Sequence, residues 1–251
     1  MIRRTAAAVL VALSATLLAA CTGADAKRAQ ELLRQAEQAQ QEVESMSFRM
    51  NIWTSGDGPR LSAHLSGGAY ARGKRAGDVV LDLDVQGGPA PMTMRIVQRD
   101  GAMFVNPGSG WTPVPSAAGA SALGGGAESA FANFDFSRYV KDVTVEEGQI
   151  LGGKAVAKIV GVVDTGALIG DLLGGLGGLA ELSGAEIPDD LSDSFGDTRA
   201  VLYVSEASHL VVGALVDLAF EHEGEKTELH VAFNVTGVDE PVKIPDPSRS
   251  V

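Results

Sequence analysis

Apolar and polar residues alternate with a period of two along most of this chain. The alternation starts with Phe48, Met50 and Ile52, which are separated by Arg49 and Asn51. It recurs at residues 61–66, 79–85, 92–96, 103–106, 143–146, 155–163, 200–205, 210–220 and 229–236. One apolar and one polar face per strand is typical of antiparallel sheets, whereas parallel sheets are buried on both faces. The pattern predicts about ten or eleven antiparallel strands.

A helical period precedes the strands. Between Lys27 and Met46 the apolar residues recur every three or four positions, with Gln, Glu and Arg between them. This narrow, alanine-rich stripe predicts a helix that lies on the sheet, and a coiled-coil partner helix is the alternative. The stripe consists of Leu32, Ala36, Ala39, Val43 and Met46.

Two longer segments interrupt the strand pattern. Residues 116–131 are rich in Ser, Ala and Gly, which predicts a loop. Residues 166–184 are apolar but broken by glycines, each of which costs a helix about 1 kcal/mol relative to alanine, so loose helical turns are predicted there. Between them lies an aromatic group that is expected to fill part of the core: Phe131, Phe134, Phe136 and Tyr139.

These elements together predict the fold class. A sheet of this size has to curl, split or close, and a curled sheet leaves a concave apolar face that needs a cover. Residues 116–140 and 164–195 are the available covers. We therefore predict an α+β fold: a strongly curved antiparallel half-barrel sheet, covered on its concave face by helices.

The first residues form a signal-peptide pattern that ends at the single cysteine. Arg3 and Arg4 supply a positive start, and residues 5–17 are apolar but too short to span a bilayer well. Leu18-Ala19-Ala20-Cys21 resembles the bacterial lipobox, which implies cleavage before Cys21 and a diacylglyceryl group, with acyl chains such as palmitate, on its sulphur. An ordinary secretory signal with an incidental cysteine is the alternative. The predicted organisation is a signal peptide (1–20), a tether (21–26) and one domain (27–251).

The charge of the chain limits its partners. The net charge is −12, and it becomes −14 when residues 1–20, which carry only two arginines, are removed. Nucleic-acid affinity rests on neutralising phosphates with Lys and Arg, so no nucleic-acid partner is expected. An anionic membrane surface also repels such a chain. Membrane attachment is therefore expected to come from acyl chains on Cys21 alone.

No catalytic or metal-binding motif survives inspection. The stretch 148–155, GQILGGKA, lacks the Ser or Thr of a P-loop, and a hairpin turn is expected there. No GxSxG elbow is present, so no hydrolase is supported. Asp82 and Asp84 are expected on a solvated strand face. The histidines lack metal-ligand spacing, and we expect neither enzyme activity nor a metal or cofactor: His64, His209, His222 and His230.

The order of elements and three stretches resemble a known family. The stretches are MFVNPGSGWTPVP, FDFSRYVKDVTVEEGQILGGKAVAKIVGVVDT and VTGVDEPVKIPDPS. They resemble the LolA/LolB-like superfamily, especially its LppX/LprG-type lipoproteins. The resemblance implies a half-barrel that encloses a hydrophobic cavity and carries lipids, acylated glycolipids or acyl chains in the cell envelope. A membrane transporter or an acceptor lipoprotein is the partner class that it implies.

The candidate binding residues are those that the alternation places on the apolar face. We predict a lipid-anchored, non-enzymatic carrier at the outer face of the bacterial plasma membrane, in the LolA/LppX-like domain 27–251. The alternative is an envelope interaction or signalling lipoprotein whose core is filled and which transports nothing. The residues expected to line the cavity are Leu81, Leu83, Met94, Ile96, Leu218, Phe220, Leu229, Val231 and Phe233.

Overall fold

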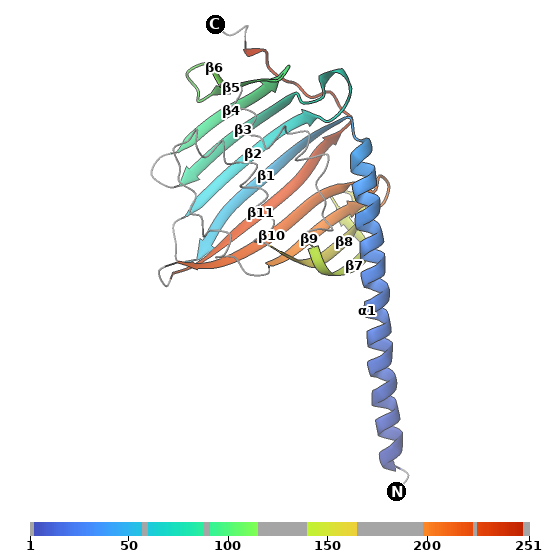
Figure 1. The fold of residues 1–251 in the computed structure, drawn as a ribbon. Coiled ribbons are helices and arrows are strands. Elements are labelled where there is room, and N and C mark those ends of the chain that lie inside the picture. The colour runs from blue at the N-terminus through green and yellow to red at the C-terminus, as the bar shows by residue number, and fades with distance from the viewer. Residues whose placement is uncertain are drawn as a thin grey trace.

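The computed structural model describes residues 3–56, 60–87, 91–114, 140–164, 198–222 and 225–247; the side chains of residues 3–22 and 220–225 are outside this description. Within these ranges the chain forms one long helix and an antiparallel sheet of eleven strands (Figure 1). The helix α1 spans Arg3–Glu42, and a short 3₁₀ turn, η1, spans Gly73–Arg75. The strands are β1 (Ser45–Gly56), β2 (Leu61–Tyr70), β3 (Val79–Gly87), β4 (Met92–Arg99), β5 (Ala102–Asn106), β6 (Thr112–Val114), β7 (Val140–Leu151), β8 (Lys154–Val163), β9 (Thr198–Ser205), β10 (Val211–His222) and β11 (Glu225–Val238).

The strands form one open sheet in the order β6-β5-β4-β3-β2-β1-β11-β10-β9-β8-β7. All neighbours are antiparallel, so β1–β6 and β7–β11 are two runs that join where β1 pairs with β11. The predicted antiparallel sheet and its number of strands are confirmed. The pattern did not predict β6, a three-residue edge strand that contains Pro113, where a missing backbone donor is tolerated.

The register brings the predicted apolar positions of successive strands onto one face. Directly paired residues point to the same side of a sheet. Met50 pairs with Leu65 on one side and with Phe233 on the other. The same face continues through the pairs Leu81–Ile96, Leu83–Met94, Leu218–Leu229, Val216–Val231 and Leu202–Ile159. We call this side the apolar face and the opposite side the polar face.

The C-terminal part of α1 packs on the apolar face at one end of the sheet. Leu33, which is 1 % exposed, lies in a buried cluster with Ile159 and Val204. The remaining members come from α1 and from β7 to β10: Ala29, Leu32, Ala36, Val143, Ala157, Leu202 and Val211. The predicted position of this helix on the sheet is confirmed. In Figure 1, α1 runs along the side where β1 begins and β11 ends, and its N-terminal part extends beyond the sheet.

The boundaries of α1 differ from the prediction at both ends. The helix ends at Glu42 rather than at Met46, because Met46 already pairs with Ala69 and Val238 in the sheet. The Asp239 carboxylate accepts the backbone N–H of Glu44 at 2.8 Å, which holds the junction between α1 and β1. In the uncut chain α1 also runs through residues 21–26, where a tether is predicted. The division into signal, tether and domain stays a prediction.

The C-terminal tail covers part of the polar face. Val242 and Ile244 pack with Val80, Val97 and Trp111. The Tyr70 hydroxyl accepts the N–H of Val242 at 3.0 Å and donates to its carbonyl at 3.3 Å. Trp111 is therefore a packing residue of the sheet, as its default interpretation predicts.

The segments predicted to cover the concave face fall largely outside the described residues. This holds for the loop at 116–131, the aromatic group at 131–139 and the glycine-broken segment at 166–184. The open antiparallel sheet agrees with the predicted half-barrel. Its predicted helical cover, apart from the packing of α1, stays a prediction.

Candidate functional site

The apolar face is the largest chemically uniform surface that the described elements build. On β1, β3 and β4 its residues are buried near α1 and become exposed toward the other end of the strands. Phe48, Val79 and Ile96 are 2 %, 1 % and 3 % exposed, whereas Met92 at the far end of β4 is 40 % exposed. The side chains between these ends are half-buried: Met50, Ile52, Leu83, Val85 and Met94.

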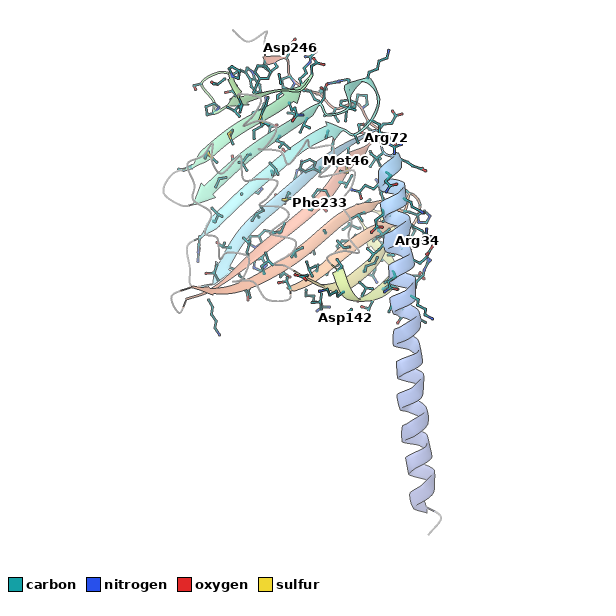
Figure 2. All side chains as sticks on the ribbon, in the orientation of Figure 1. Arg34, Met46, Arg72, Asp142, Phe233 and Asp246 are labelled. Carbon is teal, nitrogen blue, oxygen red and sulfur yellow. The ribbon has the colours of Figure 1, made fainter. Side chains whose placement is uncertain are left out.

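Two separate buried clusters lie on this face. One is the cluster beneath α1, and the other is built by β1 to β6 around Phe48, whose ring centroid lies 5.8 Å from that of Phe233. Phe233 lies near the middle of the sheet (Figure 2). On β10 and β11, beside Phe233, Val216, Leu229 and Val231 are only half-buried. The apolar face is thus packed solidly in two places and partly open elsewhere.

The structure brings the predicted lining residues together, with one exception. Leu81, Ile96, Leu83, Met94 and Phe233 lie on the apolar face, where Leu81 and Ile96 are buried and the other three half-buried. Leu218, Leu229 and Val231 follow on β10 and β11. The backbone of Phe220 pairs with Thr227, and its side chain is outside the described residues. Their role in binding a ligand stays a prediction.

Sequence reasoning missed several residues of the same face. Met50 and Ile52 were assigned to a strand but not to the site, and Leu65 was treated in the same way. Met103 and Val114 belong to the buried cluster around Phe48. The signal that identifies Met50, Ile52 and Leu65 is the same alternation that identifies Leu81 and Leu83. Only the strand order, which places β1 in the centre, shows that all of them are neighbours.

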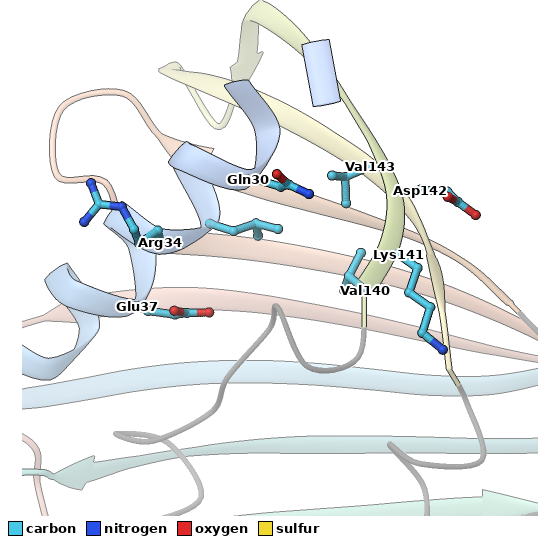
Figure 3. A pocket seen from close by; sticks show the side chains of 8 residues that line it. Gln30, Arg34, Glu37, Val140, Lys141, Asp142 and Val143 are labelled. Atoms are coloured by element: carbon cyan, nitrogen blue, oxygen red, sulfur yellow. The ribbon is translucent and has the colours of Figure 1, made fainter. Parts of the chain in front are cut away.

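A cavity of about 300 Å³ lies between α1 and β7 (Figure 3). Val140 and Val143 point toward α1, and Asp142 points away from it. The charged groups beside it are largely paired, because Arg34 donates to Glu31 and Lys141 donates to Asp164 at 3.0 Å. Arg34 and then Gln35, by hydrogen bonding, lower the pKa of the Glu31 carboxyl. The lining residues are Gln30, Leu33, Arg34, Glu37, Val140, Lys141, Asp142 and Val143.

The polar face holds the histidines and acidic residues whose positions were predicted from alternation. His64 and His230 lie on this face, and Asp82 forms an ion pair there with Arg95, whose pKa it raises. His209 is exposed in the turn between β9 and β10, and the His222 side chain is outside the described residues. Among the residues described, no group of three or more His, Cys, Asp or Glu side chains is placed to hold a metal ion.

In the part of the chain that the structure describes, no helix has the length and apolar character needed to cross a membrane.

Comparison with known proteins identifies the fold. No family model matches the chain, and no curated protein matches its sequence. Among solved structures, LprF from Mycobacterium bovis superposes with a TM-score of 0.54 at 14 % identity, covering 88 % of this chain and 97 % of LprF. The Mycobacterium tuberculosis lipoprotein LppX superposes with a TM-score of 0.50 at 14 % identity, covering 87 % of this chain and 99 % of LppX. The predicted resemblance to LppX-type lipoproteins is therefore confirmed as a shared fold.

Proposed function

We propose that this chain is a lipid-anchored carrier outside the cytoplasm that binds lipid, glycolipid or other acyl chains on its apolar face. The observation that carries the proposal is the partly open apolar face of an otherwise packed sheet, with Val231 half-buried and Met92 40 % exposed. Aliphatic surface left in water is unfavourable by roughly 25 cal/mol per Å². An acyl chain laid against this face removes both its own methylenes and these side chains from water.

The shape of the fold supports the same function. The chain spans nearly the full length of LprF and LppX, and LppX is a lipoprotein by its name. The sequence resemblance implies carriage of acylated molecules by this fold. In this proposal, acyl chains on Cys21 hold the chain at the outer face of the plasma membrane. A membrane transporter or a second lipoprotein exchanges the ligand with it.

The alternative function keeps the fold but fills its core. The cluster of α1 side chains with Ile159 and Val204 shows that one end of the apolar face is already occupied by protein. If the remaining face is filled in the same way, the chain is an interaction or signalling module. The two functions differ in whether the purified protein holds lipid.

The test is a direct search for bound lipid. The Cys21→Ser chain, purified without detergent, is extracted with organic solvent, and the extract is analysed by mass spectrometry. We expect acyl lipids in near-stoichiometric amount, and displacement of a fluorescent long-chain fatty acid by the same extract. An extract without lipid, together with no binding of the fluorescent fatty acid, contradicts the carrier function and favours the filled module.

A further inference from the structure

Three side chains on the polar face form a hydrogen-bonded chain that alternation along the sequence cannot reveal. His230 on β11 lies between Ser55 on β1 and Asp217 on β10. Its Nδ1 is 2.7 Å from Asp217 Oδ1, and its Nε2 is 2.9 Å from Ser55 Oγ. The strand order explains the juxtaposition, because β1, β11 and β10 are consecutive in the sheet and His230 pairs directly with Asp217.

The hydrogen bonds define which nitrogen can act as a base. An ionised carboxylate only accepts hydrogen bonds, so Asp217 takes the Nδ1 proton of a neutral His230. The Nε2 lone pair of that tautomer then faces the Ser55 hydroxyl, which donates to it. A serine that donates to a histidine oriented by a carboxylate is the arrangement of activated serine nucleophiles on unrelated folds.

The surroundings fix the histidine and leave the serine accessible. The Trp53 ring stacks on His230, with 5.1 Å between ring centroids and 20° between planes. Ser55 itself is exposed. Trp53 is 40 % exposed, and Leu215, two positions from Asp217 on β10, is 38 % exposed. An acyl or aryl group therefore has apolar surface on the polar face, close to the hydroxyl.

We propose that Ser55 is a nucleophilic serine that reacts with carboxylic esters on the polar face. Ser55 Oγ attacks the ester carbonyl carbon while its proton passes to His230 Nε2. The carbonyl reforms as the alcohol leaves with that proton, which gives an acyl-serine and free alcohol. Water then attacks the acyl-serine, His230 again relays the proton, and carboxylic acid and Ser55 are released. Asp217 acts as a positioning residue for His230.

Glu228 limits this reactivity. Its Oε2 lies 3.2 Å from Ser55 Oγ and 3.6 Å from His230 Nε2. The carboxylate competes for the serine proton and repels the negative charge that develops on the ester oxygen. Activated esters, whose leaving groups need little stabilisation, are therefore the expected substrates. The Glu228→Gln variant is expected to react faster than the parent.

The experiment measures covalent labelling and turnover on the full chain carrying Cys21→Ser. A fluorophosphonate probe reports the reactive serine by peptide mass spectrometry, and p-nitrophenyl acetate reports hydrolysis. We expect the label on Ser55, no label there in Ser55→Ala, and at least about tenfold slower labelling in His230→Gln. The matched control is His64→Gln, a polar-face histidine held by the Asn51 amide at 2.6 Å, which should label like the parent.

Asp217 and pH give a readout that a purely structural role would not move. Labelling of the parent should fall between about pH 8 and about pH 5, because protonated imidazole is no longer a base. Asp217→Asn should slow labelling and move this fall to lower pH, because the imidazolium loses a carboxylate partner. Absence of label on Ser55 in the parent, or equal labelling in His230→Gln, overturns the proposal. Because the reaction lies on the face opposite the apolar one, failure of the carrier function leaves this result unaffected.

Discussion

Val231 is the single residue at which carriage and a filled core make opposite predictions. It is half-buried on the apolar face, paired with Ile52 and Val216. In a carrier, Val231→Trp fills ligand space and should abolish binding of a fluorescent long-chain lipid with a near-native thermal midpoint. In a solid core the same change costs about 1–3 kcal/mol through overpacking.

The control for this prediction lies on the opposite side of the sheet. Leu215→Trp adds the same ring at an exposed position of the polar face, and it should change neither binding nor the midpoint. A lowered midpoint in Val231→Trp, with no lipid binding by the parent, would show that the apolar face is simply a core.

Asp78 tests the value of burial for a charged residue. It is 5 % exposed, and its carboxylate accepts Arg75 Nε at 3.0 Å and the backbone N–H of Asp100 at 3.2 Å. Asp78→Ala leaves both donors without this acceptor, so we expect a loss of about 1–3 kcal/mol in the free energy of unfolding.

The comparison for Asp78 is a carboxylate at the surface. The Asp82 side chain is 44 % exposed and pairs with Arg95, so Asp82→Ala should cost less than about 1 kcal/mol. Urea denaturation of the two variants measures the difference. Equal losses would contradict the assignment of Asp78 as a buried structural acceptor.

At the scale of elements, α1 is expected to be part of the folded domain and not merely a spacer. Leu33 is 1 % exposed among residues of β7 to β10, so Leu33→Ala should lower the free energy of unfolding by about 2–5 kcal/mol. Gln38→Ala, on the exposed side of α1, should change it by less than about 0.5 kcal/mol. Denaturation curves decide this, and a small effect of Leu33→Ala would mean that α1 detaches readily.

The elements also show where sequence reasoning succeeds and where it stops. A period of two identifies β1 to β5 and β7 to β11, because each strand has one wet face. It fails at β6, which is too short to show any period. It placed the end of α1 too late, because Met46 fits both the helical stripe and the alternation of β1.

The candidate sites follow the same division. Leu81 and Leu83 were predicted to face the cavity because their spacing along one strand is a local signal. The contact between Ser55 and His230 joins residues 175 positions apart. It depends on β1 pairing with β11, and no local period reports that pairing.

At the scale of the whole molecule, charge and anchor act against each other. The chain without residues 1–20 carries a net charge of −14 and is repelled by anionic lipid. Arg28 on α1 pairs with Glu147 on β7 at 2.9 Å. Seven helical residues separate Arg28 from Cys21, a length of about 10 Å, so an anchor on Cys21 would hold this end of the sheet near the membrane.

Cys21→Ala tests whether that anchor is the only attachment. The variant has to carry a cleavable secretory signal, because an uncut segment 1–20 would itself hold the chain at the membrane. We expect the variant in the soluble fraction at low and at high salt, since two acyl chains are lost and the acidic surface offers no electrostatic substitute. Thr22→Ser, beside the anchor, should remain with the membrane at both salt concentrations. Retention of Cys21→Ala on membranes at high salt would show a second, apolar attachment and would remove the lipid anchor from the proposed function.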